Sequence, residues 1–307
     1  MMIVLYFIII AIMRVLQKIC SKKASEYVND GITFFHYGGY YQMLSAVCAL
    51  VFLCFVGFHG FNLSTIICAV ISALLFALDL FTGIEAIKGT SLVVCNMFAL
   101  GGLFVPCVSG IFLFDEPMSI WQWSGLIVFV LSIYFLSAKE NKEEKKAAKP
   151  FTLRTFFMLV LSFIVNGLVM LVQKYFALLV PDRNEATFSF LTFAINAVIL
   201  YAGMLLIGLK KKKSQSDREE RIIQIKKLPK PLLVCGAVLA VALFTINLLV
   251  TVMASEIESV VLFTVSSALS IVITALVGAL IFKEKLTAKN YIGLVLGFFS
   301  CVMVSVF

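Results

Sequence analysis

A few charged and amide side chains interrupt apolar stretches of the chain, and these groups are the first candidates for chemistry. Asp79 is the clearest, because it lies within the apolar segment Phe76-Ala77-Leu78-Asp79-Leu80. An ionisable group inside a membrane-spanning helix is costly and usually faces a cavity or an opposite charge. Asp79 is therefore predicted either to bind a proton or a cationic solute, or to pair with Arg14 or Lys18 and serve only helix packing.

Basic and amide residues near the end of the first apolar segment recur later in the chain. Arg14 and Lys18 are four residues apart, so they lie on one face of a helix, and Gln17 adjoins them. The dipeptide Gln17-Lys18 returns as Gln173-Lys174. Lys18 and Lys174 are predicted either to be gate residues that alternately hold a substrate carboxylate or carbonyl, or to extend their long stems to lipid headgroups. The second interpretation is favoured, because both residues are close to predicted helix ends.

Three aromatic and titratable side chains gather early in the second apolar segment, namely His36, Tyr40 and Tyr41. One interpretation is a vestibule that recognises an aromatic or cationic solute, in which a histidine titrates near neutral pH. The other, which is favoured, is an aromatic belt at the membrane interface.

Amide and carboxylate side chains also lie inside other apolar segments. Asn96, Asn166 and Asn196 are predicted either to bind substrate or, in the commoner role, to hydrogen-bond neighbouring helices. Glu85 is predicted to be an interfacial carboxylate near Lys88.

Motifs for other kinds of chemistry are missing from the sequence. It has no HExxH, no CxxC and no P-loop, and it offers no nucleophile with a plausible base. Its eight cysteines are predicted to be reduced, buried, small hydrophobic residues. The sequence therefore predicts no enzyme, no ATP-driven pump, and no cofactor or metal site. The basic runs Lys210–Lys213 and Lys226–Lys230 are expected to contact anionic lipid headgroups, and they lack the aromatic interleaving of a nucleic-acid surface.

Long apolar segments must position these side chains. The chain is 62% hydrophobic and 14% charged, with a mean hydropathy of +1.05. A soluble domain carries about 25% charged residues, whereas the apolar blocks here have the roughly 18–25 residues that cross a bilayer. The sequence predicts an all-α integral membrane protein with ten transmembrane helices. Their approximate ranges are 2–20, 33–57, 64–87, 90–114, 119–138, 153–177, 187–209, 231–254, 258–282 and 290–307.

One motif occurs twice and divides the chain into two similar halves. Phe114-Asp115-Glu116-Pro117-Met118-Ser119 returns as Phe282-Lys283-Glu284-Lys285-Leu286-Thr287, 168 residues later. The predicted repeats are residues 1–140 and 151–307, joined by a charged linker at 141–150. The same offset relates Gly110 to Gly278, Gly125 to Gly293, Ser132 to Ser300 and Asp79 to Asn247, which makes Asn247 a further candidate.

The number of helices in each half fixes how the two halves enter a membrane. Because five is odd, the second half enters from the opposite side, which gives the inverted repeat found in many secondary transporters. All but two of the 25 Lys and Arg residues flank the odd-numbered connections between predicted helices, and the exceptions are Lys174 and Arg183. Since basic residues favour the cytoplasmic side, these connections are predicted to be cytoplasmic and both ends of the chain to face outward.

The repeated motif resembles the EamA-type repeat of the drug/metabolite transporter superfamily. The resemblance extends over essentially the whole chain and rests on residues 114–119 with Gln122 and Gly125, and on residues 282–287 with Asn290 and Gly293. It implies ten helices in two inverted five-helix halves and transport of small metabolites or drugs. With the inverted repeat this predicts secondary-active transport by alternating access, and Asp79, as an ionisable residue within an apolar helix, is the candidate for proton coupling. Ten-helix relatives are usually described with cytoplasmic ends, whereas the charge distribution here predicts that both ends face outward.

Two other functions stay open, a flippase for lipid-linked head groups and a non-transporting membrane scaffold or receptor. The expected partners are a small-molecule solute and the lipids of a cell membrane, with no nucleic acid. Gly293 and Gly297 form a GxxxG that permits close helix packing within one chain or between two, so the protein is expected to be a monomer or a homodimer.

Overall fold

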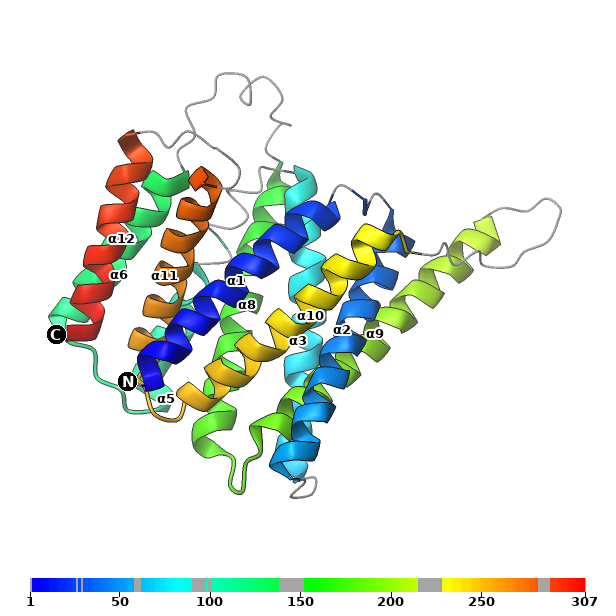
Figure 1. The fold of residues 1–307 in the computed structure, drawn as a ribbon, viewed down its shortest axis with the longest axis horizontal. Helices are drawn as coiled ribbons and strands as arrows, with labels where there is room; N and C mark the ends of the chain where they lie inside the picture. Colours follow the sequence, from blue (N-terminus) through cyan, green and yellow to red (C-terminus); the bar gives the residue numbers. More distant parts are fainter. Residues whose placement is uncertain are drawn as a thin grey trace. The chain divides into compact units, whose positions relative to one another are not determined.

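The computed structural model describes residues 2–25, 27–28, 30–57, 62–89, 98, 101–137, 152–214, 228–280 and 288–306. These residues contain ten α-helices and no strand, and each helix overlaps one predicted span (Figure 1). The helices are α1 (Met2–Ser25), α2 (Gly31–Val56), α3 (Leu63–Gly89), α5 (Phe104–Leu113), α6 (Ile120–Ser137), α8 (Leu153–Leu179), α9 (Glu185–Ser214), α10 (Lys230–Met253), α11 (Ser259–Leu280) and α12 (Ala288–Val306).

Five described segments are long and apolar enough to cross a bilayer, because a helix of about 20 residues spans about 30 Å. They are Gly31–Val56, Leu63–Thr82, Leu153–Leu179, Glu185–Gly208 and Lys230–Met253. Five shorter apolar helical segments accompany them, at Met2–Gln17, Phe104–Leu113, Ile120–Ser132, Ser259–Ser270 and Tyr291–Val304. The chain is therefore an all-helical protein with the segments of a multi-pass membrane protein.

Polar side chains start two helices in the same way. The carboxylate of Asp30 accepts a hydrogen bond from the Thr33 N–H at the start of α2 (2.9 Å), and the amide oxygen of Asn184 accepts one from the Thr187 N–H at the start of α9 (2.9 Å). Such N-caps satisfy backbone donors that have no partner within the helix. Asn184 also donates to the carbonyl of Gly57 (3.3 Å), so the start of α9 lies beside the end of α2.

The chain divides into two compact units, and each takes helices from both predicted repeats. Unit 1 comprises Met1–Ile12, Leu78–Val180 and Leu249–Phe307, and unit 2 comprises Met13–Ala77 and Pro181–Leu248. In unit 1, α6 packs along α12, α11 contacts α5, α6 and α12, and α5 also contacts α8. In unit 2, α2 packs along α9. Figure 1 shows α6 beside α12 and α2 beside α9.

The core of unit 2 joins α1, α2 and α10 through aromatic and small side chains. Tyr37 and Tyr41 of α2 are buried together with Cys20 of α1 and Cys235 of α10. A Cβ atom on Gly236 would lie 2.7 Å from the Tyr40 ring, so the missing side chain lets the tyrosines approach α10.

In unit 1, α8 approaches the chain closely just before α5. The chain turns at residues 102–103, and α5 then begins at Phe104. A Cβ atom on Gly167 of α8 would lie only 2.5 Å from Val105 Cβ and would also collide with the carbonyl oxygen of Gly102. Glycine at position 167 therefore allows α8 to contact this turn directly.

Candidate functional site

The turn between α5 and α6 holds the acidic side chain of the repeated motif. α5 ends where the N–H groups of Phe114 and Glu116 both donate to the carbonyl of Gly110, each at 3.1 Å. Asp115 lies between them with a φ of 51°. A residue in this left-handed conformation commonly ends a helix, and aspartate adopts it more readily than most residues. The turn thus directs Glu116 back across the end of α5.

The next helix begins with a reciprocal pair of hydrogen bonds between Ser119 and Gln122. The Ser119 hydroxyl accepts from the Gln122 N–H (3.2 Å), and the Gln122 amide oxygen accepts from the Ser119 N–H (2.9 Å). This arrangement is a capping box, which satisfies two free donors at a helix start. Both ends of the turn that carries Glu116 are therefore fixed by hydrogen bonds.

The Glu116 carboxylate binds two groups that are distant in sequence. One oxygen pairs with the Lys174 ammonium of α8 at 2.6 Å, and the other accepts the N–H of Ser259 at 2.9 Å. Ser259 is the first residue of α11, where the helix dipole favours a negative charge. A Cβ atom on Gly110 would lie 2.7 Å from the same carboxylate oxygen, so glycine leaves the space that Glu116 fills.

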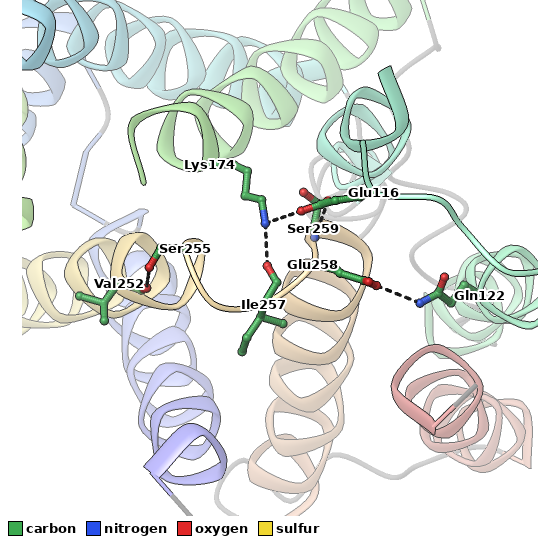
Figure 2. Close-up of polar contacts among 8 residues, drawn as sticks. All are labelled: Glu116, Gln122, Lys174, Val252, Ser255, Ile257, Glu258 and Ser259. Atoms are coloured by element: carbon green, nitrogen blue, oxygen red, sulfur yellow. Dashed lines mark hydrogen bonds and ion pairs between the residues drawn. The ribbon is translucent and has the colours of Figure 1, made fainter. Parts of the chain in front are cut away.

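Lys174 is buried, with only 2% of its side chain exposed. Besides Glu116, its ammonium donates to the carbonyl of Ile257 at 2.6 Å, and Figure 2 shows it reaching from α8 to the turn between α10 and α11. The favoured expectation that Lys174 extends to lipid headgroups is therefore wrong. The physical reason is that this face of α8 packs against the α5–α6 and α10–α11 turns. The Lys174 ammonium therefore binds a carboxylate and a backbone carbonyl there instead of extending to lipid.

A second contact ties the same turn to α6. The Gln122 side-chain nitrogen donates to the Glu258 carboxylate at 3.3 Å (Figure 2). The oxygen of the same amide caps α6. We call the group of Glu116, Gln122, Lys174, Ile257, Glu258 and Ser259 the Lys174 junction. It joins α8, the α5–α6 turn and the α10–α11 turn, all within unit 1.

Asp79 is half-buried in α3, and its side chain hydrogen-bonds to that of Asn166 in α8. Both residues belong to unit 1. Arg14 and Gln17 are half-buried on the part of α1 that belongs to unit 2. The partner that the structure gives Asp79 is thus the uncharged amide of Asn166.

The remaining predicted residues lie in several places. Asn247 of α10 is buried and donates to the Ser189 hydroxyl of α9 at 2.8 Å within unit 2. Gln173 is buried on α8 in unit 1. The side chain of Lys18 and all of Asn96 lie outside the described residues.

The aromatic group of α2 packs against other helices. His36 is half-buried, with its ring 6.4 Å from that of Tyr201 in α9. Tyr41 is buried in the core of unit 2, and the Tyr40 hydroxyl donates to the carbonyl of Leu233 in α10 at 3.3 Å. The expectation of an interfacial aromatic belt is therefore wrong for Tyr41, because its ring packs in the core beside the small residues Cys235 and Ala240 of α10. For His36 and Tyr40 it stays a prediction.

Glu85 forms an ion pair with Arg154 at the start of α8, at 3.1 Å. The sequence placed this carboxylate near Lys88, whose side chain lies outside the described residues. Arg154 is 74% exposed, so this ion pair is far more open to solvent than that of Lys174.

Glu116, Glu258 and Ser259 were not among the residues predicted to form a site. One signal for Glu116 was present, because the acidic residue recurs in both copies of the motif and Lys174 needs a counter-charge in an apolar segment. For Ser259, which contributes only its backbone N–H, the sequence carries no signal.

Comparisons with known proteins agree with this architecture. The sequence profile of the EamA-like transporter family matches residues 153–306. No curated protein sequence matches the chain. A protein of known crystal structure aligns with a TM-score of 0.70 and 10% identity, over 98% of this chain and 96% of the other. At that identity the alignment shows a shared fold alone.

Proposed function

Because the chain belongs to the EamA-like transporter family, we propose that it is a secondary-active transporter of small metabolites or drugs that works by alternating access. The family handles small solutes, and the described helices include the apolar segments of a multi-pass membrane protein. A flippase for lipid-linked head groups and a non-transporting scaffold or receptor are not favoured. In this proposal the protein is not an enzyme.

The observation that carries the mechanism is a reciprocal pair of hydrogen bonds between α6 and α12. The Ser132 hydroxyl donates to the carbonyl of Gly293 (2.7 Å), and the Ser300 hydroxyl donates to the carbonyl of Gly125 (2.8 Å). Ser132 and Ser300 are equivalent positions of the two repeats, as are Gly125 and Gly293. Exchanging the repeats therefore converts one bond into the other, which is the signature of a local two-fold axis.

The direction of this axis follows from the order of the contacts. Gly125 lies early in α6, whereas its partner Ser300 lies late in α12, so the two helices are antiparallel. A two-fold axis between antiparallel helices runs perpendicular to both. For helices that cross a bilayer, it lies in the membrane plane, as in transporters built from inverted repeats. The geometry thus supports two inverted five-helix halves.

The Lys174 junction suits a gate in such a cycle. It fastens three segments at helix ends through charged and backbone groups, with both lysine contacts at 2.6 Å. In the proposed cycle the junction alternates between two states, one with the ion pair formed and the segments held together, and one with the ion pair broken and the segments free to move. In the proposed cycle it closes one side of the transporter and opens when the other side closes.

Asp79 is the proposed coupling group. Its carboxylate lies in an apolar helix with the neutral partner Asn166, so it can hold or release a proton without breaking an ion pair with that partner. Proton binding would then alter the contact between α3 and α8 within unit 1.

Transport measurements test this function directly. A thermal-shift screen of metabolites on the purified protein identifies a bound solute, since a ligand of the folded state stabilises it, and proteoliposomes then report its uptake under a pH gradient. We expect Asp79→Asn to abolish gradient-driven uptake while the protein still inserts and still exchanges solute across the membrane. Undiminished gradient-driven uptake in Asp79→Asn would overturn the coupling role. Glu85→Gln is the matched carboxylate control and should behave like the wild type.

A further inference from the structure

Buried polar side chains in unit 2 cluster on one face of α9. Ser189, Thr192 and Asn196 are spaced three and four residues apart, so they follow one another along the same side of the helix. All three are fully buried. Phe193 lies on the same face between them.

Two contacts show which helices this face meets. The Ser189 hydroxyl accepts a hydrogen bond from Asn247 of α10 at 2.8 Å. The ring of Phe193 lies 6.2 Å from the ring of Phe76 in α3. Ser72 lies one turn before Phe76 on α3 and is also fully buried. The polar face of α9 therefore contacts α3 and α10 inside unit 2.

Several polar atoms in this group have no hydrogen-bond partner among the described residues. They are both amide atoms of Asn196, the hydroxyl of Thr192 and the hydroxyl of Ser72. Native proteins pair nearly all buried polar groups, because a donor or acceptor removed from water without a partner is destabilising. The Asn196 amide, with neither its donors nor its acceptor paired, departs from this rule. A bound ligand or an ordered water molecule would supply the hydrogen bonds that it lacks.

From this geometry we propose that Asn196 and Thr192 bind a neutral amide group of the transported solute, with Phe76 and Phe193 contacting its apolar part. The inference rests on the proposed transport function, because it assigns a solute class to this protein. The Asn196 side chain presents two donors and one acceptor in a plane, which complements the donor and acceptor of another amide. The Thr192 hydroxyl can donate or accept.

The chemistry of Asn196, Thr192, Phe76 and Phe193 disfavours a charged group at this position. None of them is ionisable, and a carboxylate or ammonium buried among them would lose its hydration without gaining a counter-charge from the group. A neutral amide loses less on leaving water and regains its hydrogen bonds from Asn196.

Two matched pairs of small probes test the assignment on the purified full-length protein. Nicotinamide and benzamide carry a neutral amide on an aromatic ring, and nicotinate and benzoate replace that amide with a carboxylate. We expect the two amides to raise the melting temperature in a concentration-dependent way, and the carboxylates to leave it unchanged at the same concentrations. Equal shifts from amides and carboxylates, or no shift from either amide, would overturn the proposal.

Substitution locates the binding. Asn196→Leu keeps a side chain of similar size without the unpartnered polar atoms, so the variant should fold with an unchanged or higher melting temperature. Its affinity for nicotinamide should fall at least tenfold, whereas Ser124→Ala, on another helix in unit 1, should bind nicotinamide as the wild type does. If Asn196→Leu is more stable and still binds nicotinamide normally, the amide atoms hold water and the site assignment is wrong.

The two proposals can fail separately. Nicotinamide that binds through Asn196 but never crosses proteoliposome membranes would count against transport and leave the binding site standing. Uptake of a solute that is unaffected by Asn196→Leu would support transport and refute the site.

Discussion

The buried ammonium of Lys174 depends on the Glu116 carboxylate for its stability. The two side chains are 2% and 15% exposed, so neither charge is well solvated by water. Removing one partner of a buried ion pair leaves the other charge uncompensated, whereas replacing both by apolar groups is often close to neutral. The junction should therefore tolerate loss of both charges better than loss of one.

Lys174→Met should lower the free energy of unfolding by about 3–5 kcal/mol, because Glu116 is left buried without a counter-charge. Unfolding by SDS titration in mixed micelles measures the change. The double variant Lys174→Met/Glu116→Leu should recover most of the loss.

The exposed ion pair supplies the control for this experiment. Arg154→Gln removes a partner that is 74% exposed and pairs at 3.1 Å, so it should cost at most about 1 kcal/mol. Equal losses from Arg154→Gln and Lys174→Met would show that burial does not set the strength of the Lys174 ion pair.

The sequence identified Lys174 as unusual but assigned it the wrong environment. Hydropathy and helical spacing place a residue along its helix and on a face, yet they do not say which segment meets that face. The partners of Lys174 lie 58 and 83 residues away, at Glu116 and Ile257. One of those contacts is to a backbone carbonyl, which no residue type can signal.

Helix positions followed from the sequence more closely than helix partners did. The predicted span 153–177 corresponds to α8 at Leu153–Leu179, because a continuous apolar run defines it. The predicted span 187–209 is shorter than α9, Glu185–Ser214. The difference arises because Asn184 caps the helix early and the lysines at 210–213, which favour helix, extend it beyond the apolar run.

The repeat also predicted equivalent helices without predicting that they contact each other. Ser132 and Ser300 were matched in sequence, but only the structure shows that each bonds to the other's helix. A one-dimensional offset relates positions in a chain and carries no information about an axis in space.

Because Ser132 and Ser300 make equivalent hydrogen bonds, removing either hydroxyl should lower the stability of the protein by a similar amount. Ser132→Ala and Ser300→Ala should each destabilise the protein by about 0.6 kcal/mol, and at most about 1.7 kcal/mol, which is the range of hydrogen bonds between transmembrane helices. The two losses should be similar, because the bonds have nearly equal lengths and both hydroxyls are buried. SDS titration again provides the measurement.

A serine that bonds within its own helix gives the comparison. The Ser124 hydroxyl donates to the carbonyl of Ile120 at 2.8 Å, one turn earlier in α6, so Ser124→Ala should leave stability nearly unchanged. A large loss from one of Ser132 and Ser300, with none from the other, would contradict the two-fold relation.

The charge distribution over the chain predicts its orientation in the membrane. Of the two basic residues predicted on the side of the even-numbered connections, Lys174 is buried against Glu116 and Arg183 pairs with Glu185 at 3.2 Å. The positive-inside rule counts Lys and Arg and gives acidic residues little weight, so these two ion pairs leave the count of basic residues unchanged. The positive-inside rule then favours cytoplasmic odd-numbered connections.

Labelling in intact cells tests that orientation. An epitope placed after Phe307 should react with an antibody in unpermeabilised cells, because ten crossings with cytoplasmic odd-numbered connections leave both ends of the chain outside. The same epitope inserted within residues 141–150, where lysines and glutamates already form a charged linker, should react only after permeabilisation. The opposite pattern would give the protein cytoplasmic ends. It would also place the Lys174 junction on the cytoplasmic side, and the proposed gate would then close toward the cell interior.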